Sequence, residues 1–299
     1  MMATEAQIIE ALFVSMNASF VKGVSRANPQ WDKIATEVPS SGASNFYGWL
    51  KDLPEIKEWV GDRQLADVGK HGYAITNKTF ESSISISREN VEDDQIGQYS
   101  VLAERFGDQV TMFPDKLSYP LLAAGFNTLC YDGQNYFDTD HPLDTTPAST
   151  FSNVVGDPAT DTGSPWFLLD NSQTLKPIVY QNRRPFTFKN MNPTEEYTWF
   201  NNKFAAGTDG RCEVGFSFPQ LAIGSKAALT EANYEAAVKL LGGMKRADGV
   251  PLGVRPTTLV VGYANRAAAK KLIERMLIEG GDTNVYYQDV EVIVSPFIA

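Results

Sequence analysis

Apolar residues recur every three or four positions in two long stretches of the chain, the spacing of an amphipathic helix. Near the N-terminus this pattern predicts a helix within residues 1–25, followed by an extended arm. The apolar face of that helix consists of Ile8, Leu12, Phe13 and Met16.

The second stretch predicts a long helix over residues 91–127, which begins at an acidic turn where Asp93 or Asp94 caps it. Pro114 and Pro120 should each kink or interrupt its path. A helix of about 30 residues reaches roughly 45 Å at 1.5 Å per residue, enough to cross a flat subunit. Its apolar stripe comprises Ile96, Tyr99, Leu102, Phe106, Val110, Phe113, Leu117, Leu121, Leu122 and Phe126.

Between these helices, apolar and polar residues alternate strictly, the period of a β-strand. The alternation predicts a long, mostly polar hairpin over residues 72–87, with its turn at Asn77-Lys78. An isolated hairpin is at best marginally stable in water. We therefore expect this ribbon to lie on a neighbouring subunit, which points toward assembly rather than catalysis.

The middle of the chain is rich in Pro, Gly, Ser, Thr and Asp over residues 127–165 and predicts an irregular insertion. Short apolar runs then predict strands up to residue 224. These strands are Trp166–Leu169, Pro177–Gln181, Pro185–Phe188, Tyr197–Phe200 and Glu213–Phe218.

The last third alternates helices and strands, which suggests an α/β lobe that folds by itself after a boundary near Ser225. The first helix opens at Thr230 and ends near Gly242-Gly243. The second covers Asn265 to Ile278, with Ala268, Leu272 and Met276 on its inner face. The predicted strands are Thr257–Val261 and Val290–Val294.

Composition excludes several classes of protein. The 299 residues are 43% hydrophobic, so the chain can bury a core and is not a disordered one. A formal charge of −10 without any long basic run argues against a surface devoted to nucleic acid. The chain has no uninterrupted apolar run of 18 residues and no signal-peptide pattern, so we expect no membrane partner and a cytoplasmic site of folding.

Candidate chemistry is sparse. Asp132, Asp138, Asp140 and His141 could hold a divalent cation, which makes a metal-dependent hydrolase the alternative function. A hydrogen-bonded Asx turn is the competing interpretation of the same residues. Cys130 and His141 are the only thiol and imidazole close in sequence, and a buried free thiol is the simpler reading of both Cys130 and Cys212. Glycine-rich phosphate loops and serine elbows are absent, so we predict no catalytic residue, cofactor or metal.

Aromatic residues near the ribbon have two interpretations. Trp31, Trp49 and Trp59 either pack on the chain's own core or form an arm that docks on neighbouring subunits. We take the second interpretation for the contact prediction. The predicted inter-subunit residues are Trp31, Trp49, Trp59, Tyr73, Asn77, Lys78 and Phe80.

A series of short segments, spread over nearly the whole chain, resembles the major head subunit of Mu-like phages and prophages. The segments are Trp31–Ser40, Tyr47–Leu50, Glu58–Arg63, Arg88–Asp94, Leu121–Phe126, Cys130–Gln134, Phe137–Pro142, Pro165–Asp170, Leu175–Pro177 and Arg255–Val261. The resemblance implies the Hong Kong 97 capsid fold, an α+β architecture. It assigns an N-terminal arm to residues 1–60, an extended E-loop hairpin to 61–90, a spine helix to 91–127, a loop insertion with peripheral-domain strands to 128–225 and an axial domain to 226–299.

The same resemblance implies a structural protein whose hexamers and pentamers form an icosahedral head around packaged double-stranded DNA. Its partners are further copies of itself, DNA held without sequence recognition, a separate scaffold, a portal and decoration proteins. It is assembled in the cytoplasm of a bacterial host and ends in the virion. A tail-tube protein is a further alternative within phage assembly.

One feature departs from the family pattern. In many relatives the chain returns from the axial domain and completes the peripheral sheet at the C-terminus, whereas here it ends soon after Val294. The strands between Trp166 and Phe218 are expected to supply the peripheral sheet instead.

Overall fold

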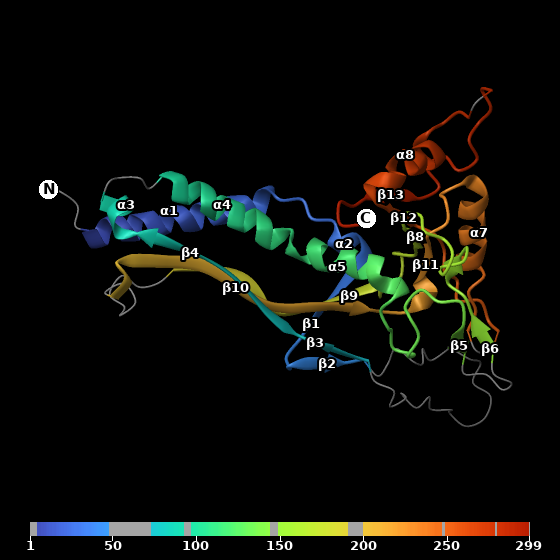
Figure 1. The fold of residues 1–299 in the computed structure, drawn as a ribbon, viewed down its shortest axis with the longest axis horizontal. Coiled ribbons are helices and arrows are strands. Elements are labelled where there is room, and N and C mark those ends of the chain that lie inside the picture. The colour runs from blue at the N-terminus through green and yellow to red at the C-terminus, as the bar shows by residue number, and fades with distance from the viewer. Residues whose placement is uncertain are drawn as a thin grey trace.

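The fold was analysed in a computed structural model that describes residues 5–47, 73–92, 97–143, 149–190, 200–246, 249–278 and 280–298. Trp49, Trp59, the residues from 61 to 72 of the predicted E-loop, and the helix-capping Asp93 and Asp94 lie outside this part of the chain. The subunit is extended, with a long wing of two helices on a ribbon-like sheet and a lobe around a second sheet at the other end (Figure 1).

The N-terminal helix, α1 (Glu5–Arg26), confirms the predicted one and lies beside α4 (Gly97–Thr111). The two helices run in the same direction, since Ser15 contacts Ser100 at one end and Arg26 pairs with Asp108 at the other. By length and composition alone, α1 could also cross a membrane. One apolar face of the helix is buried against α4 and the sheet, whereas Val14, Val21 and Val24 are exposed. The buried side chains are Ile9, Leu12, Phe13, Met16 and Phe20.

The predicted long helix is present as a sequence of shorter ones: α3 (Arg88–Glu92), α4, α5 (Phe113–Ala123) and the 3-10 turn η2 (Ala124–Phe126). The break falls at Met112, two residues before Pro114, which lies in the first turn of α5. Proline is tolerated there because the N–H that it lacks has no partner within a first helical turn. Pro120 lies inside α5, which continues past it to Ala123.

The wing is built on a four-stranded sheet in the order β1 (Ala35–Pro39), β9 (Ile178–Asn190), β10 (Lys203–Phe216) and β4 (Lys78–Ser87). β9 and β10 have 13 and 14 residues, so this antiparallel pair extends for about 45 Å. The two strands predicted on either side of Pro185 are one strand. The pairing of β9 with β10 shifts register beside this proline, which has no N–H to donate to the ladder.

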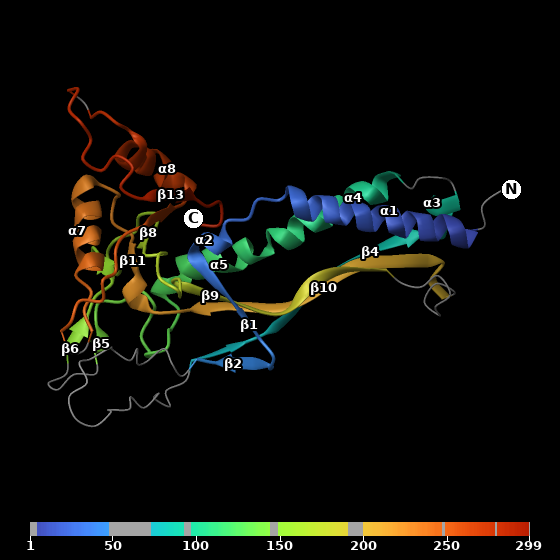
Figure 2. The same ribbon diagram turned by 180° about the vertical axis from the view of Figure 1, so that it is seen from behind.

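The predicted hairpin over residues 72–87 is wrong. β3 (Ala74–Thr76) pairs with β2 (Ser44–Phe46). β4, which is separated from β3 only by Asn77, pairs along its whole length with β10. The alternation in β4 has another cause: one face of the strand, with Phe80, Ile84 and Ile86, packs under the helices. Figure 2 shows β4 running beneath α1 and α4, and β2 and β3 below the sheet.

The lobe contains a five-stranded sheet in the order β13 (Glu291–Val294), β12 (Thr258–Val261), β8 (Trp166–Leu169), β11 (Ala222–Ser225) and β7 (Val154–Val155). Helix α7 (Glu231–Gly242), capped by the Thr230 hydroxyl, packs on one face with the helical segments α8 (Arg266–Ala269) and η5 (Lys270–Glu274). The predicted boundary at Ser225 therefore separates strands of one sheet. Residues 226–299 do not form a lobe of their own, because β7, β8 and β11 precede that boundary.

Two further expectations need correction. The strands between Trp166 and Phe218 do not all belong to one sheet, because β8 lies in the sheet of the lobe and β9 and β10 lie in the sheet of the wing. The helix predicted to reach Ile278 ends at Glu274, and Met276 is 56% exposed. The side-chain amide of Asn284 explains this end, because it donates hydrogen bonds to the carbonyls of Leu272 and Arg275, both at 2.8 Å.

The α1–α4 contact depends on glycine at Gly23 and Gly107. A Cβ at Gly107 would lie 2.1 Å from the carbonyl oxygen of Phe20, and one at Gly23 would lie 2.0 Å from that of Glu104. We expect Gly107→Ala to lower the free energy of unfolding by about 1–3 kcal/mol, because the helices must move apart. Urea unfolding of unassembled subunits measures this.

Gly97→Ala is the matched control in the same helix, since nothing lies within 4 Å of a Cβ there. It should leave the unfolding free energy unchanged or slightly raised. Equal losses in both variants would contradict a steric role for Gly107.

Candidate functional site

Two of the predicted contact residues pack inside their own subunit. The ring of Trp31 lies 4.9 Å from that of Tyr180, and Trp31 contacts the core cluster that contains Tyr119 and Leu122. Phe80 lies 4.7 Å from Phe113 in an edge-to-face arrangement. For these two side chains the structure supports the simpler interpretation of packing on the chain's own core.

Asn77 lies in the interior and not at an exposed turn, so its side chain is engaged within its own subunit. It is 5% exposed, its amide donates to Ser40 Oγ at 2.9 Å and to the carbonyl of Gly42 at 3.1 Å, and its oxygen accepts from Gln181 Nε2 at 2.7 Å. These bonds join the segment between β1 and β2, the residue between β3 and β4, and β9. A residue with every polar atom engaged internally has little left for a neighbour.

Tyr73 and Lys78 flank this region. The Tyr73 hydroxyl accepts a hydrogen bond from the Phe216 N–H at 3.3 Å, and burial raises the pKa of this tyrosine. Lys78 pairs with Glu213 at 2.7 Å, yet its side chain remains 70% exposed. Among the described contact candidates, Lys78 presents the most accessible side chain to a partner.

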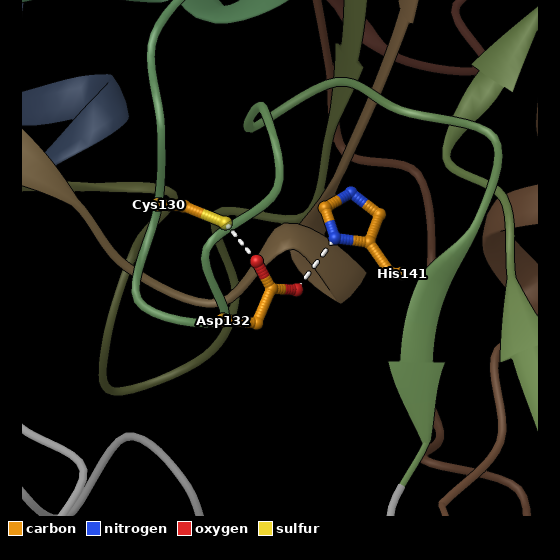
Figure 3. Close-up of side chains that lie close together, drawn as sticks. All are labelled: Cys130, Asp132 and His141. Carbon is orange, nitrogen blue, oxygen red and sulfur yellow. Dashed lines mark hydrogen bonds and ion pairs between the residues drawn. The ribbon is translucent and has the colours of Figure 1, made fainter. Parts of the chain in front are cut away.

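The loop that carries the candidate metal ligands closes on itself through a tight turn. The Cys130 N–H donates to the carbonyl of Gln134 at 2.8 Å, and Leu129 bridges Asn135. Gly133 adopts a φ of +86°, a conformation that residues other than glycine rarely adopt. The turn places the carboxylate of Asp132 between Cys130 and His141 (Figure 3).

Asp132 is the centre of a buried polar cluster. Its Oδ2 lies 2.7 Å from His141 Nδ1, and its Oδ1 accepts hydrogen bonds from Cys130 Sγ at 2.9 Å and from the Gln134 N–H at 3.0 Å. Burial alone would raise the pKa of Asp132, but the bonds from His141, Cys130 and Gln134 outweigh it and lower that pKa. The imidazole is fully buried and stacks on Phe151, 4.9 Å between centroids.

This arrangement does not suit nucleophilic catalysis. Burial, followed by the hydrogen bond to Asp132, raises the pKa of the Cys130 thiol well above its usual range. The thiol donates to a carboxylate and not to the imidazole, so His141 is not placed to deprotonate it.

The four predicted metal ligands are not brought together. Within the described ranges, the donor atoms that lie within 4.8 Å of one another belong to Cys130, Asp132 and His141. Asp138 instead accepts from the N–H of Thr139 at 2.7 Å, and Asp140 is exposed. The Asx turn that the competing interpretation expected is present at Asp132, whose Oδ1 accepts from the N–H of Gln134. Cys130 was not among the predicted metal ligands, although it lies only two positions before Asp132 in the sequence.

The chain is similar to known phage head proteins along almost its full length. A family model described as "Mu-like prophage major head subunit gpT" matches residues 9–298. The chain is 39% identical to the Mu-like prophage FluMu major head subunit of Haemophilus influenzae, over 90% of each chain. It is 38% identical to the major capsid protein of Escherichia phage Mu, over 95% of each.

Solved capsid structures share the fold. The procapsid of bacteriophage JBD30 matches with a TM-score of 0.85 and 38% identity, covering 97% of this chain and 98% of that one. The JBD30 capsid matches with a TM-score of 0.78 and 29% identity, covering 91% and 92%. These likenesses bear out the capsid fold and leave the hydrolase alternative without support.

The ionised Asp132 should stabilise the loop in a pH-dependent way. Its folded pKa lies below the ordinary value of 3.8, so this stabilisation is complete above about pH 4 and is lost as the pH falls through the folded pKa. Asp132→Asn should lower the unfolding free energy by about 1–3 kcal/mol at pH 7, with a smaller difference below pH 4. Urea unfolding from pH 3 to pH 7 measures both effects.

Asp140→Asn provides the control, because this exposed carboxylate lies in the same loop outside the cluster. Its effect should stay within about 0.5 kcal/mol. A loss for Asp132→Asn that does not change with pH would argue against an ionised carboxylate.

Proposed function

The chain belongs to the family of Mu-like prophage major head subunits, and on that premise we propose how it builds its shell. It is a structural protein of the virion, a major capsid protein that forms the phage capsid with copies of itself. We propose that these copies form hexamers and pentamers that close into an icosahedral head. The single observation that best supports this is the full-length likeness to the JBD30 procapsid subunit.

Contacts in such a shell are heterologous, since each copy presents two different surfaces and the repeated rotation closes a ring. The extended wing and the lobe suit this geometry because they offer separated surfaces. We propose that the lobe around the five-stranded sheet lies toward the capsomer centre, as the axial domain. The spine formed by α4 and α5 then runs outward. The E-loop proposed for residues 61–90 would include β4, which lies at the edge of the wing sheet.

Packaged double-stranded DNA is the proposed content of the shell. The formal charge of −10 supports contact without tight binding, because a strongly basic wall would hold DNA and hinder its release. A separate scaffold and a portal are proposed as further partners, with assembly in the host cytoplasm. Decoration is also proposed, since one JBD30 capsid, whose subunit is 28% identical at a TM-score of 0.76, carries minor capsid protein trimers.

Electron microscopy of the expressed protein tests the central proposal. Co-expression with the scaffold of the same phage should give closed shells whose capsomers show six-fold and five-fold symmetry. Open tubes would favour the tail-tube alternative, and a stable monomer at high concentration would contradict assembly.

Substitution of single tryptophans distinguishes packing within the subunit from docking on a neighbouring subunit. Trp31→Ala should lower the unfolding free energy of the free subunit by about 3 kcal/mol or more, because the ring packs on Tyr180. We propose that Trp49 and Trp59 contact neighbours, so Trp49→Ala and Trp59→Ala should reduce shell yield while the free subunit keeps its stability. Urea unfolding and particle counts measure the two effects. Loss of subunit stability in all three variants would overturn the docking role.

A further inference from the structure

Three arginines meet in the middle of the wing sheet, at an irregularity in the pairing of β9 with β10. Cys212 lies opposite Asn182 and Arg211 lies opposite Arg184, so Arg183 has no partner of its own in the ladder. At such a bulge, two residues of one strand oppose a single residue of its neighbour. The bulge therefore brings Arg183, Arg184 and Arg211 together, and we call these three residues the arginine cluster.

The arginine cluster lies on the face of the sheet that is turned away from α1 and α4 (Figure 2). Phe204 and Ala206 of β10 are buried in the core beneath those helices. Side chains alternate between the two faces of a strand, so Asp209 and Arg211 point to the opposite face. The side chain of Arg184 is 50% exposed there, which leaves the cluster accessible to an anion from solvent.

One carboxylate serves two cations at this place. Asp209 pairs with Arg184 and also with Lys189, the latter at 2.5 Å. Hydrogen bonding from Lys189 and the charge of Arg184 lower the pKa of the Asp209 carboxyl. Asp209 is thus already engaged by two cations, and Arg183 and Arg211 form no ion pair with it.

The other carboxylates near the bulge have partners of their own. Glu81, opposite Asp209 in β4, accepts a hydrogen bond from Ser83 Oγ at 2.9 Å. Glu213, further along β10, pairs with Lys78 at 2.7 Å. Around the bulge, five cations against three carboxylates leave an excess of two positive charges, although the whole chain has a formal charge of −10.

Two nitrogens of the arginine cluster are buried without a hydrogen-bond acceptor among the residues that the structure describes. They are Nη1 of Arg183 and Nε of Arg211. Moreover, Arg211 lies directly opposite Arg184, and like charges in opposed positions of a ladder repel each other. Buried polar groups without partners are rare in folded proteins, and a bound ion is one explanation for them. An anion at the cluster would both accept from these nitrogens and offset the repulsion.

We propose that the arginine cluster binds a phosphate group. The planar guanidinium fork matches phosphate oxygens, and a tetrahedral anion offers oxygens to more than one fork. A phosphate monoanion or dianion carries about −1.5 to −2 charges on average at pH 7, which matches the excess of positive charge. A carboxylate has two oxygens and a single charge, so one bidentate arginine satisfies it.

The phosphate has two possible sources, free phosphate in solution and the backbone of DNA. The site itself does not depend on the proposed function, because an unassembled subunit should already hold the anion.

Thermal unfolding of unassembled subunits tests the site. Phosphate at about 20 mM should raise the unfolding temperature by about 2–4 °C over chloride of the same ionic strength, the shift for a Kd roughly a tenth of that concentration. Arg211→Gln and Arg183→Gln should each remove at least half of this rise. In chloride, Arg211→Gln should unfold at the natural temperature or slightly above it, since it removes the repulsion from Arg184.

Lys203→Gln is the matched control, because it removes an exposed cation from the same strand outside the bulge. It should keep the full rise. The control also accounts for the general stabilisation that phosphate gives by exclusion from protein surfaces. An equal rise in all variants, or no rise in the natural subunit, would overturn the proposal.

Fluorescence anisotropy with a short labelled DNA duplex identifies the source of the phosphate. Duplex binding that phosphate competes away and that Arg211→Gln weakens severalfold assigns the site to the DNA backbone. A phosphate-dependent rise without duplex binding assigns it to free phosphate. If instead Arg211→Gln abolishes shell formation while phosphate has no effect on the natural subunit, the cluster binds a carboxylate of a neighbouring copy and the proposal is wrong.

Discussion

The two ends of this subunit depend on one aromatic cluster, where the spine meets the sheet of the lobe. The ring of Phe126, in the last turn of the spine, lies 5.0 Å from Phe137 and 6.2 Å from Phe167 in β8. The rings fit because two neighbours have no side chain: a Cβ at Gly125 or Gly224 would lie 2.7 Å from the ring of Phe137. The wing and the lobe thus share one packed core. This core fixes the orientation of the wing relative to the lobe.

The polar cluster around Asp132 serves this contact. Asp132 closes the loop that carries Tyr136 and Phe137, and the Tyr136 hydroxyl donates toward the carbonyls of Pro177 and Phe218, both at 3.2 Å. The Tyr136 ring also stacks on Phe216 at 4.0 Å. In the sequence, the thiol, carboxylate and imidazole of this cluster look like a reactive site. In the structure they hold the loop that orients the aromatic rings. The hydrogen bonds that Asp132 accepts from Cys130, Gln134 and His141 give these residues a structural role in the loop.

Local sequence patterns predicted those helices and strands whose formation depends on residues close together in the chain. α1, the spine, β8, α7 and β12 follow from periodicity and caps, because those features depend on neighbours in the chain. Local patterns do not reveal which strands pair with one another. The alternation in β4 correctly indicated a strand with one apolar face, but it could not reveal that β10, more than a hundred residues away, supplies the hydrogen bonds. The end of the helix at Glu274 depends likewise on Asn284, which lies beyond it in the sequence.

The edges of the wing sheet bear on how copies associate. In the part of the chain that the structure describes, β1 and β4 are its outer strands. Exposed edges invite indiscriminate pairing between chains, and charged side chains or proline discourage it. β4 carries Lys78 and Glu81 among its serines, and β1 ends at Pro39. This protein must associate with its copies in one geometry. Pairing between the edge strands of two copies would specify the register poorly, so discouraging it favours the correct assembly. Assembly then depends on side-chain surfaces, which specify both partner and angle.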